Sequence, residues 1–99
     1  MRRLESLWRE HCKAPFPKAL TGRNEADFDL ITLDTMTAGC IQVWVEQNGR
    51  IDLKRVAILQ KCHADLDRVV GSLSGESKIY FSRLEEIAQR ALAAVVKIE

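Results

Sequence analysis

The sequence lacks the features that would place the protein outside the cell or inside a membrane. Its cysteines, at positions 12, 40 and 62, are odd in number and do not make a complete disulfide framework. No apolar run approaches the roughly 20 residues that a membrane-spanning helix needs. The N-terminal segment MRRLESLWREHC is too charged for a secretory signal peptide. We therefore expect a cytoplasmic protein in a reducing compartment, without membrane contact.

An excess of charge of one sign is also missing. The net charge is +1, which gives no electrostatic reason to expect nucleic acid as a partner. The sequence has no glycine-rich phosphate loop and no internal repeat, and its pattern shows no strand pair. With 46% hydrophobic and 29% charged residues, the composition is that of a folded globular chain. The 99 residues suffice for one domain, 1–99, with a single core.

The most informative stretch is residues 30–49, LITLDTMTAGCIQVWVEQNG. It contains no Lys or Arg, and no charged residue lies between Asp34 and Glu46. On a helix that turns about 100° per residue, its apolar residues cover more than half of the circumference. They leave a narrow uncharged strip that includes Thr35 and Gly39. This pattern predicts the central helix of a small domain, contacted on several sides.

A shorter amphipathic helix is expected over residues 3–13, with His11 on its apolar face. Ala14 ends this helix because it precedes Pro15, and the residue before a proline is pushed out of the α region. Residues 14–28 then show neither helical nor strand periodicity. Loops of that length are uncommon in compact domains. The pattern leaves open whether this loop is a working lid or only a connection.

Capping signals divide the rest of the chain into three longer helices. Asp27 or Asp29 is expected to cap the first of them, and Asn48-Gly49 to end it. The next helix is expected over 53–70, and the last from about 75 to near the C-terminus. Because the connections are short, successive helices should run antiparallel. The predicted fold class is all-α, a small antiparallel bundle of about four helices.

Two Cys–His neighbours, His11-Cys12 and Cys62-His63, raise the question of a metal site. Adjacent residues on a helix point about 100° apart, so neither couple readily shares one ion. His63 and Asp67 are four residues apart and are the one pair with suitable ligand spacing. A single pair does not complete a site, so the sequence predicts no metal and no cofactor.

The three thiols differ in setting. Cys40 and Cys62 fall on apolar stripes and are expected to be inert core residues. Cys12 lies beside Lys13 near the predicted loop, which makes it the best placed of the three to react. No catalytic residue is predicted from these positions.

Asp34 falls inside the apolar arc if the central helix begins near Leu30. A carboxylate there needs a partner or has a raised pKa, which makes it a candidate functional residue. Two other interpretations stay open. The helix could begin later with Asp34 as its N-cap, or Asp34 could be a structural partner for an arginine, His63 or Trp8.

Two stretches favour self-association. Thr35 and Gly39 form a small-residue strip that allows another helix, from this chain or from a second copy, to approach closely. The C-terminal ALAAVVKI is apolar on nearly every side if it continues the last helix, and Ile79 points away from the main apolar stripe. For this C-terminal stretch, coverage by the N-terminal helix and residues 14–28 is the alternative to a dimer contact. The predicted interface residues are Thr35, Gly39, Ile79, Leu92, Val95, Val96 and Ile98.

Several motifs resemble a set of short uncharacterised bacterial helical proteins of about this length. They are LWREH followed by PFP, the run D-x-x-x-L-D-x-x-x-A-G-C from Asp29 to Cys40, and the turn NGR-x-D. The resemblance covers most of the chain and implies a bacterial cytosolic helical protein. It carries no activity, cofactor or site residue.

The leading functional prediction is a non-enzymatic interaction or accessory module that forms a homodimer or binds a protein partner. The alternative is a small metal- or thiol-dependent enzyme or sensor that uses His11, Cys12, Asp34, His63 or Asp67. Residues 48–52 could also be taken as the turn of a helix-turn-helix. The long flanking helices and the near-zero net charge argue against that DNA-binding interpretation.

Overall fold

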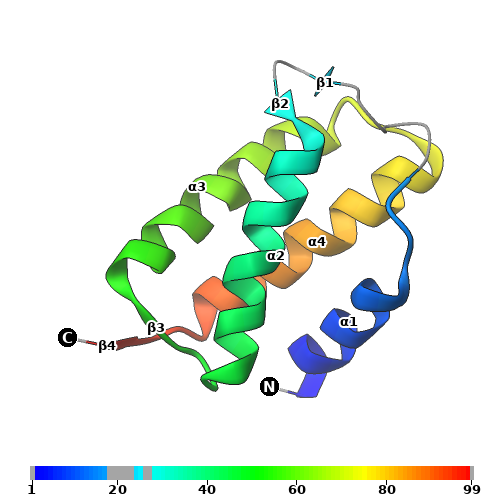
Figure 1. Cartoon of the computed structure of the whole chain (residues 1–99). Helices are drawn as coiled ribbons and strands as arrows, with labels where there is room; N and C mark the ends of the chain where they lie inside the picture. The colour runs from blue at the N-terminus through cyan, green and yellow to red at the C-terminus, as the bar shows by residue number, and fades with distance from the viewer. Residues whose placement is uncertain (1, 18–23, 26–27, 99) are drawn as a thin grey trace.

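The computed structural model describes residues 2–17, 24–25 and 28–98, most of which belong to four helices (Figure 1). These are α1 (Arg2–Lys13), α2 (Leu30–Glu46), α3 (Leu53–Val70) and α4 (Gly75–Ala93). Helices α2, α3 and α4 run alternately down, up and down, and α1 lies beside α4. The predicted all-α bundle, with one short N-terminal helix and three longer ones, is confirmed.

The bounds of α2 follow from its capping residues. The Asp29 carboxylate accepts hydrogen bonds from the backbone N–H groups of Ile31 and Thr32, at 3.1 and 3.2 Å. The prediction that Asp29 caps this helix is confirmed, whereas the interpretation of Asp34 as the N-cap is wrong because Asp34 lies inside the helix. At the other end, Gly49 has φ +87°, and an added Cβ would lie 3.2 Å from the carbonyl oxygen of Ala94. Glycine is therefore required at this turn on both counts.

Helices α3 and α4 begin near the predicted positions but have no side-chain caps. Asp52 occupies the N-cap position of α3, yet its carboxylate accepts from the Arg55 guanidinium at 2.7 Å instead of from a backbone N–H. Ser74 occupies the N-cap position of α4 and makes no capping hydrogen bond. The first N–H groups of α4 are consequently not satisfied by the residue that normally serves them.

Two short strand pairs accompany the helices, although the sequence pattern indicated none. β1 (Asn24–Glu25) pairs antiparallel with β2 (Phe28–Asp29), inside the stretch predicted to be a loop. β3 (Arg50–Asp52) pairs parallel with β4 (Val96–Ile98).

The second pair corrects the prediction that the last helix runs through the C-terminal apolar stretch, since α4 ends at Ala93. Val95, Val96 and Ile98 are β-branched and fit a strand better than a helix.

The core lies where α2, α3 and α4 meet. Its largest fully buried side chains include Trp44, Phe81, Leu30, Ile41, Leu59, Leu66, Leu84 and Ile87. Cys40 and Cys62 are buried in this core, as predicted. Met36 was assigned to the apolar arc of α2 but is 46% exposed. No helix in the described part of the chain is long and apolar enough to cross a membrane.

Candidate functional site

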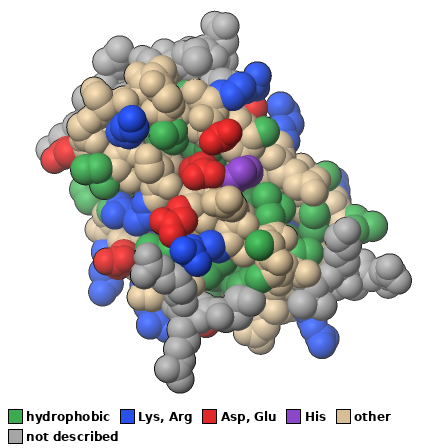
Figure 2. All heavy atoms as spheres, turned by 180° about the vertical axis from the view of Figure 1, so that it is seen from behind, with side chains coloured by type: hydrophobic (Ala, Val, Ile, Leu, Met, Phe, Trp, Pro, Cys, Tyr) green, Lys and Arg blue, Asp and Glu red, His purple; other side chains and the backbone are tan. Residues whose placement is uncertain are grey.

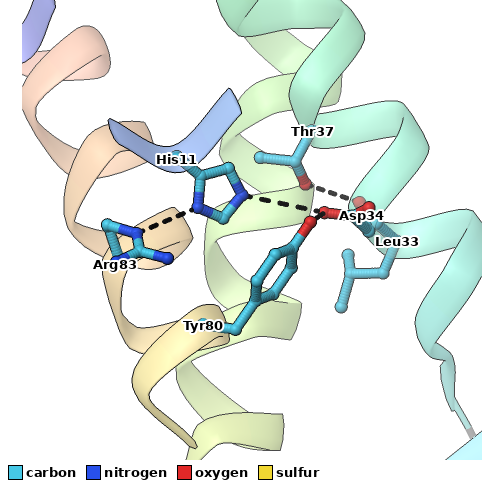
Figure 3. A network of polar contacts seen from close by, with 6 residues as sticks. All are labelled: His11, Leu33, Asp34, Thr37, Tyr80 and Arg83. Atoms are coloured by element: carbon cyan, nitrogen blue, oxygen red, sulfur yellow. Dashed lines mark hydrogen bonds and ion pairs between the residues drawn. The ribbon is translucent and has the colours of Figure 1, made fainter. Parts of the chain in front are cut away.

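A polar network joins three helices at the side of the bundle where α1 packs (Figure 3). His11 comes from α1, Asp34 from α2, and Tyr80 and Arg83 come from α4. α1 directs His11 inward because Leu4, Trp8 and His11 repeat at helical spacing and form its buried face. Tyr80 and Arg83 are three residues apart and therefore share one face of α4. Local helix geometry thus brings all four side chains to the same place.

The carboxylate of Asp34 lies at the centre of this network. The Tyr80 hydroxyl donates to Asp34 Oδ1 at 2.9 Å, and His11 Nε2 lies 4.0 Å from the same oxygen. The interpretation of Asp34 as a structural partner is supported, but the partners proposed for it from the sequence are wrong. They were sought among an arginine, His63 and Trp8, whereas the structure supplies a tyrosine and the other histidine.

The His11 ring has different surroundings at its two nitrogens. Its Nδ1 accepts a hydrogen bond from Arg83 Nε at 3.2 Å, so the ring proton resides on Nε2. Nε2 is buried and has no hydrogen-bond partner within the described residues. The ring also packs against Tyr80, with centroids 4.4 Å apart, and lies nearly parallel to Trp8. His11 therefore holds α1 against α4 through both polar and aromatic contacts.

Burial raises the pKa of the Tyr80 phenol well above its ordinary range, and the adjacent Asp34 carboxylate raises it further. A phenolate would lack hydration here and would face a negative charge at hydrogen-bond distance. Tyr80 is therefore a protonated donor throughout the physiological range, and it holds the Asp34 carboxylate by a hydrogen bond from its hydroxyl.

A cleft of about 400 Å³ opens beside this network, between α1 and α2. Trp8 and Gln42 close one side of it, because Trp8 Nε1 donates to Gln42 Oε1 at 3.2 Å. Three of the candidate residues, His11, Cys12 and Asp34, line this cleft together. Cys12 is exposed, and partial burial raises the pKa of its thiol, which lowers the thiolate fraction at neutral pH.

A larger cavity of about 710 Å³ lies on the other side of Tyr80, between residues 14–17 and the beginning of α4. Phe16 forms part of its wall and packs edge-on against Tyr80 and Phe81, with centroids 5.6 and 5.9 Å away. Sequence reasoning missed Tyr80 and Arg83 as site residues. The sequence did contain a signal for Tyr80, because it lies on the apolar face of its predicted helix. A buried phenol needs a hydrogen-bond partner, so its position indicated a polar contact inside the bundle.

His63 and Asp67 do not form the pair that their spacing predicted. His63 Nε2 lies 2.6 Å from Glu85 Oε2 on α4, and Asp67 is exposed on α3. The prediction considered spacing within one helix, whereas the closer carboxylate comes from the neighbouring helix. Within the ranges that the structure describes, no three His, Cys, Asp or Glu side chains are grouped as a metal ion would require.

The predicted interface residues are divided between two regions. Thr35 and Gly39 are exposed on α2, and Ile79 is 63% exposed on α4. Leu92 and Val95 are half-buried and pack against the core. The backbones of Val96 and Ile98 belong to β4, and their side chains lie outside the described residues. The C-terminal part of the prediction thus loses its helical basis, while the α2 part keeps it.

Comparisons with family models, curated proteins and solved structures returned no match for this chain. Any functional assignment consequently depends on the geometry and chemistry of its own residues.

Proposed function

We propose that this protein is a non-enzymatic interaction module that forms a homodimer through the exposed side of α2. The observation that carries this proposal is a difference in charge between helices. Every exposed residue of α2 before Glu46 is uncharged, and we name these six residues the α2 face: Ile31, Thr32, Thr35, Met36, Gly39 and Gln42.

The other helices expose ionised side chains at short intervals, for example Arg9 on α1, Lys61 on α3 and Arg90 on α4. The back of the molecule, opposite the side where α2 lies in Figure 1, carries interspersed acidic and basic side chains (Figure 2). Protein interfaces are depleted in charged residues at their centres. The back also carries hydrophobic side chains, so the distinction of the α2 face is its lack of charge (Figure 2). An uncharged helix face beside helices that expose charges favours contact with another protein.

Gly39 lies in the middle of the α2 face and is exposed. Apart from its chain neighbours and the nearby backbone of α2, no atom of the described residues lies within 4 Å of the position that its Cβ would occupy. A glycine inside a helix costs about 1 kcal/mol relative to alanine, and no packing within the described chain offsets that cost. A gap at this position, one turn after Thr35, allows the backbone of a second helix to approach closely.

The shape of the surface also favours a second copy. The α2 face borders two hollows: Gly39 and Gln42 line the cleft toward α1, while Thr32 and Met36 line a groove of about 430 Å³ between α2 and α3. Helices pack by placing ridges into grooves, and a two-fold axis brings the same patch of each subunit together. A helix face flanked by hollows is thus complementary to itself.

The test is sedimentation or native mass spectrometry over a range of protein concentrations. We expect the wild-type protein to form a dimer and Gly39→Arg to be a folded monomer with an unchanged helix content, because its side chain projects into open space. Ala64→Arg, on the exposed and charged side of α3, is the matched control and should leave the dimer intact.

A wild-type protein that is monomeric up to about 100 µM would contradict the proposal, since contacts weaker than that rarely act as stable interfaces. Dissociation by Ile79→Lys but not by Gly39→Arg would place the interface on α4 instead.

A second candidate function, thiol chemistry at Cys12, is favoured by one observation. His11, Cys12 and Asp34 line the same cleft, as the alternative prediction requires. The raised pKa of the Cys12 thiol weighs against it, because the thiolate is the reactive form. Because burial raises the pKa of the Cys12 thiol, its alkylation by iodoacetamide should be slow at pH 7 and should accelerate only at a more alkaline pH than that of a free cysteine. Rapid alkylation at pH 6 would restore the thiol enzyme or sensor as the better proposal.

The three unpaired cysteines agree with a reducing compartment, and we propose a cytoplasmic location on that basis.

A further inference from the structure

The cavity of about 710 Å³ at the beginning of α4, here named the α4 cavity, has a chemistry that the dimer proposal does not use. It shares no residue with the α2 face. Its volume falls within the range of about 300–1,000 Å³ that is usual for small-molecule sites. Phe16 and Tyr80 provide aromatic walls, while Ser77 and Arg83 are polar residues of α4 that also line it.

Ser77 is nine-tenths buried and borders the α4 cavity. Its hydroxyl has no hydrogen-bond partner among the residues that the structure describes. Among the described residues, the fully buried side-chain atoms without a partner are His11 Nε2 and Trp44 Nε1, so the Ser77 oxygen is not fully buried and keeps some exposure at the cavity. This hydroxyl is therefore available to a group that enters the cavity.

Arg83 supplies a positive charge that no carboxylate in the described chain neutralises. Its Nε donates to His11, and Arg83 is one of the residues that line the cavity. Arg83 and Ser77 both line the cavity, although Arg83 Nε is directed to His11 on α1. The six-residue separation corresponds to a rise of about 9 Å along α4 and a turn of about 120° around it, so a carboxylate that contacts both groups would lie over Tyr80, between them.

The beginning of α4 adds a partial positive charge. The first hydrogen bond of this helix runs from Lys78 N to the Ser74 carbonyl, so the N–H groups of residues 75–77 precede it. The Ser74 side chain does not cap them. Uncapped N–H groups and the helix dipole together favour an anion at this end. Glu76 also borders the cavity, and its negative charge disfavours a doubly charged ligand.

We propose that the α4 cavity binds a small organic carboxylate with a flat apolar body. The carboxylate would lie between the Ser77 hydroxyl and the Arg83 guanidinium, and the body would pack against Phe16 and Tyr80.

The test uses ¹⁵N-labelled full-length protein titrated with sodium phenylacetate. We expect saturable shifts of the amide resonances at the beginning of α4 and around Arg83. Phenylacetamide, which has the same ring and no charge, should bind at least about tenfold more weakly, because charge-assisted hydrogen bonds are about twice as strong as neutral ones. Phenyl phosphate, which is doubly charged at pH 8, should also bind more weakly than phenylacetate.

Two substitutions and one control locate the site. Arg83→Gln should weaken phenylacetate binding at least about tenfold, whereas Arg90→Gln, which removes the arginine paired with Glu86 further along α4, should not change it. Glu76→Gln should tighten phenylacetate binding about two- to fivefold. A gain in affinity cannot be explained by a damaged fold, whereas a loss can. The absence of saturable shifts up to about 50 mM, equal binding of phenylacetamide, tighter binding of phenyl phosphate, or an equal loss in Arg90→Gln would each overturn the proposal.

Discussion

The chain has two histidines, each next to a cysteine in the sequence and each near a carboxylate in the structure. His11 is 4% exposed and contacts groups from α2 and α4 through both of its nitrogens and its ring. His63 is 27% exposed and makes one contact across α3 and α4, to Glu85. The comparison shows that the face of the helix, and not the Cys–His dipeptide, determines the role. An inward face makes His11 a junction of three helices, whereas an edge position makes His63 half of a surface pair.

The largest difference between the two histidines should appear on truncation. His11→Ala removes a buried ring and leaves Arg83 Nε without its acceptor, and we expect the free energy of unfolding to fall by about 3 kcal/mol. Urea denaturation measures this change. Hydrogen exchange should accelerate most in α1, which loses its main polar attachment. A loss below about 1 kcal/mol would show that the network around His11 contributes little to stability.

Tyr80→Phe tests a single bond in the same network. The substitution keeps the aromatic contacts with His11 and Phe16 and removes only the hydroxyl that donates to Asp34. We expect a loss of about 1 kcal/mol, and the same urea experiment measures it. The matched control is Asp34→Asn, which keeps an oxygen that can accept from Tyr80 and should cost less. An equal or larger loss in Asp34→Asn would show that the carboxylate charge matters more than the hydrogen bond.

The pH dependence of the same contact can be followed directly, because Tyr80 is the only tyrosine in the chain. Its pKa is raised in the folded protein by burial and by Asp34, while in the unfolded chain it titrates near pH 10. The folded state therefore holds this proton more tightly. The stabilisation that it provides is complete below about pH 10 and is lost as the pH rises further. Phenolate absorbance should consequently appear at higher pH in the native protein than in urea, and coincident curves would contradict the assignment.

The smallest effects belong to the His63–Glu85 pair. His63→Ala and Glu85→Gln should each change the free energy of unfolding by no more than about 0.5 kcal/mol, because partly exposed ion pairs contribute little. The coupling between them in a double-mutant cycle should shrink further in about 1 M salt, where screening acts over about 3 Å. A coupling energy above about 2 kcal/mol would show that His63 stabilises the fold about as much as His11 does, which would contradict the difference between the two histidines.

The parts of the fold that depend on local signals were predictable from the sequence. Asp29 and Gly49 mark the ends of α2 because capping and the left-handed turn are decided within a few residues. The C-terminal stretch was not predictable in this way. Its conversion to β4 depends on pairing with β3, which lies far away in the sequence, and that pairing has no local signature.

The candidate site shows the same division. Periodicity correctly placed His11 on an inward face and flagged Asp34 as a carboxylate in an apolar arc. Their partners Tyr80 and Arg83 come from α4, so their identity depends on how the helices cross, which side-chain packing decides. For the same reason, spacing within α3 named Asp67 as the partner of His63 when the closer carboxylate was Glu85.

The contact between His11 and Arg83 joins residues 72 apart in the sequence. Helix α1 is the first to be synthesised, but its docking surface includes the last helix to be made. At about 5–20 residues per second, the ribosome needs between about 4 and 14 s to cover that distance. During this time Leu4 and Trp8, which are buried in the finished fold, have no α4 to pack against. Among the four described helices, α1 therefore waits longest for the helix that completes its burial, and its apolar face is open to chaperones and to aggregation during that time.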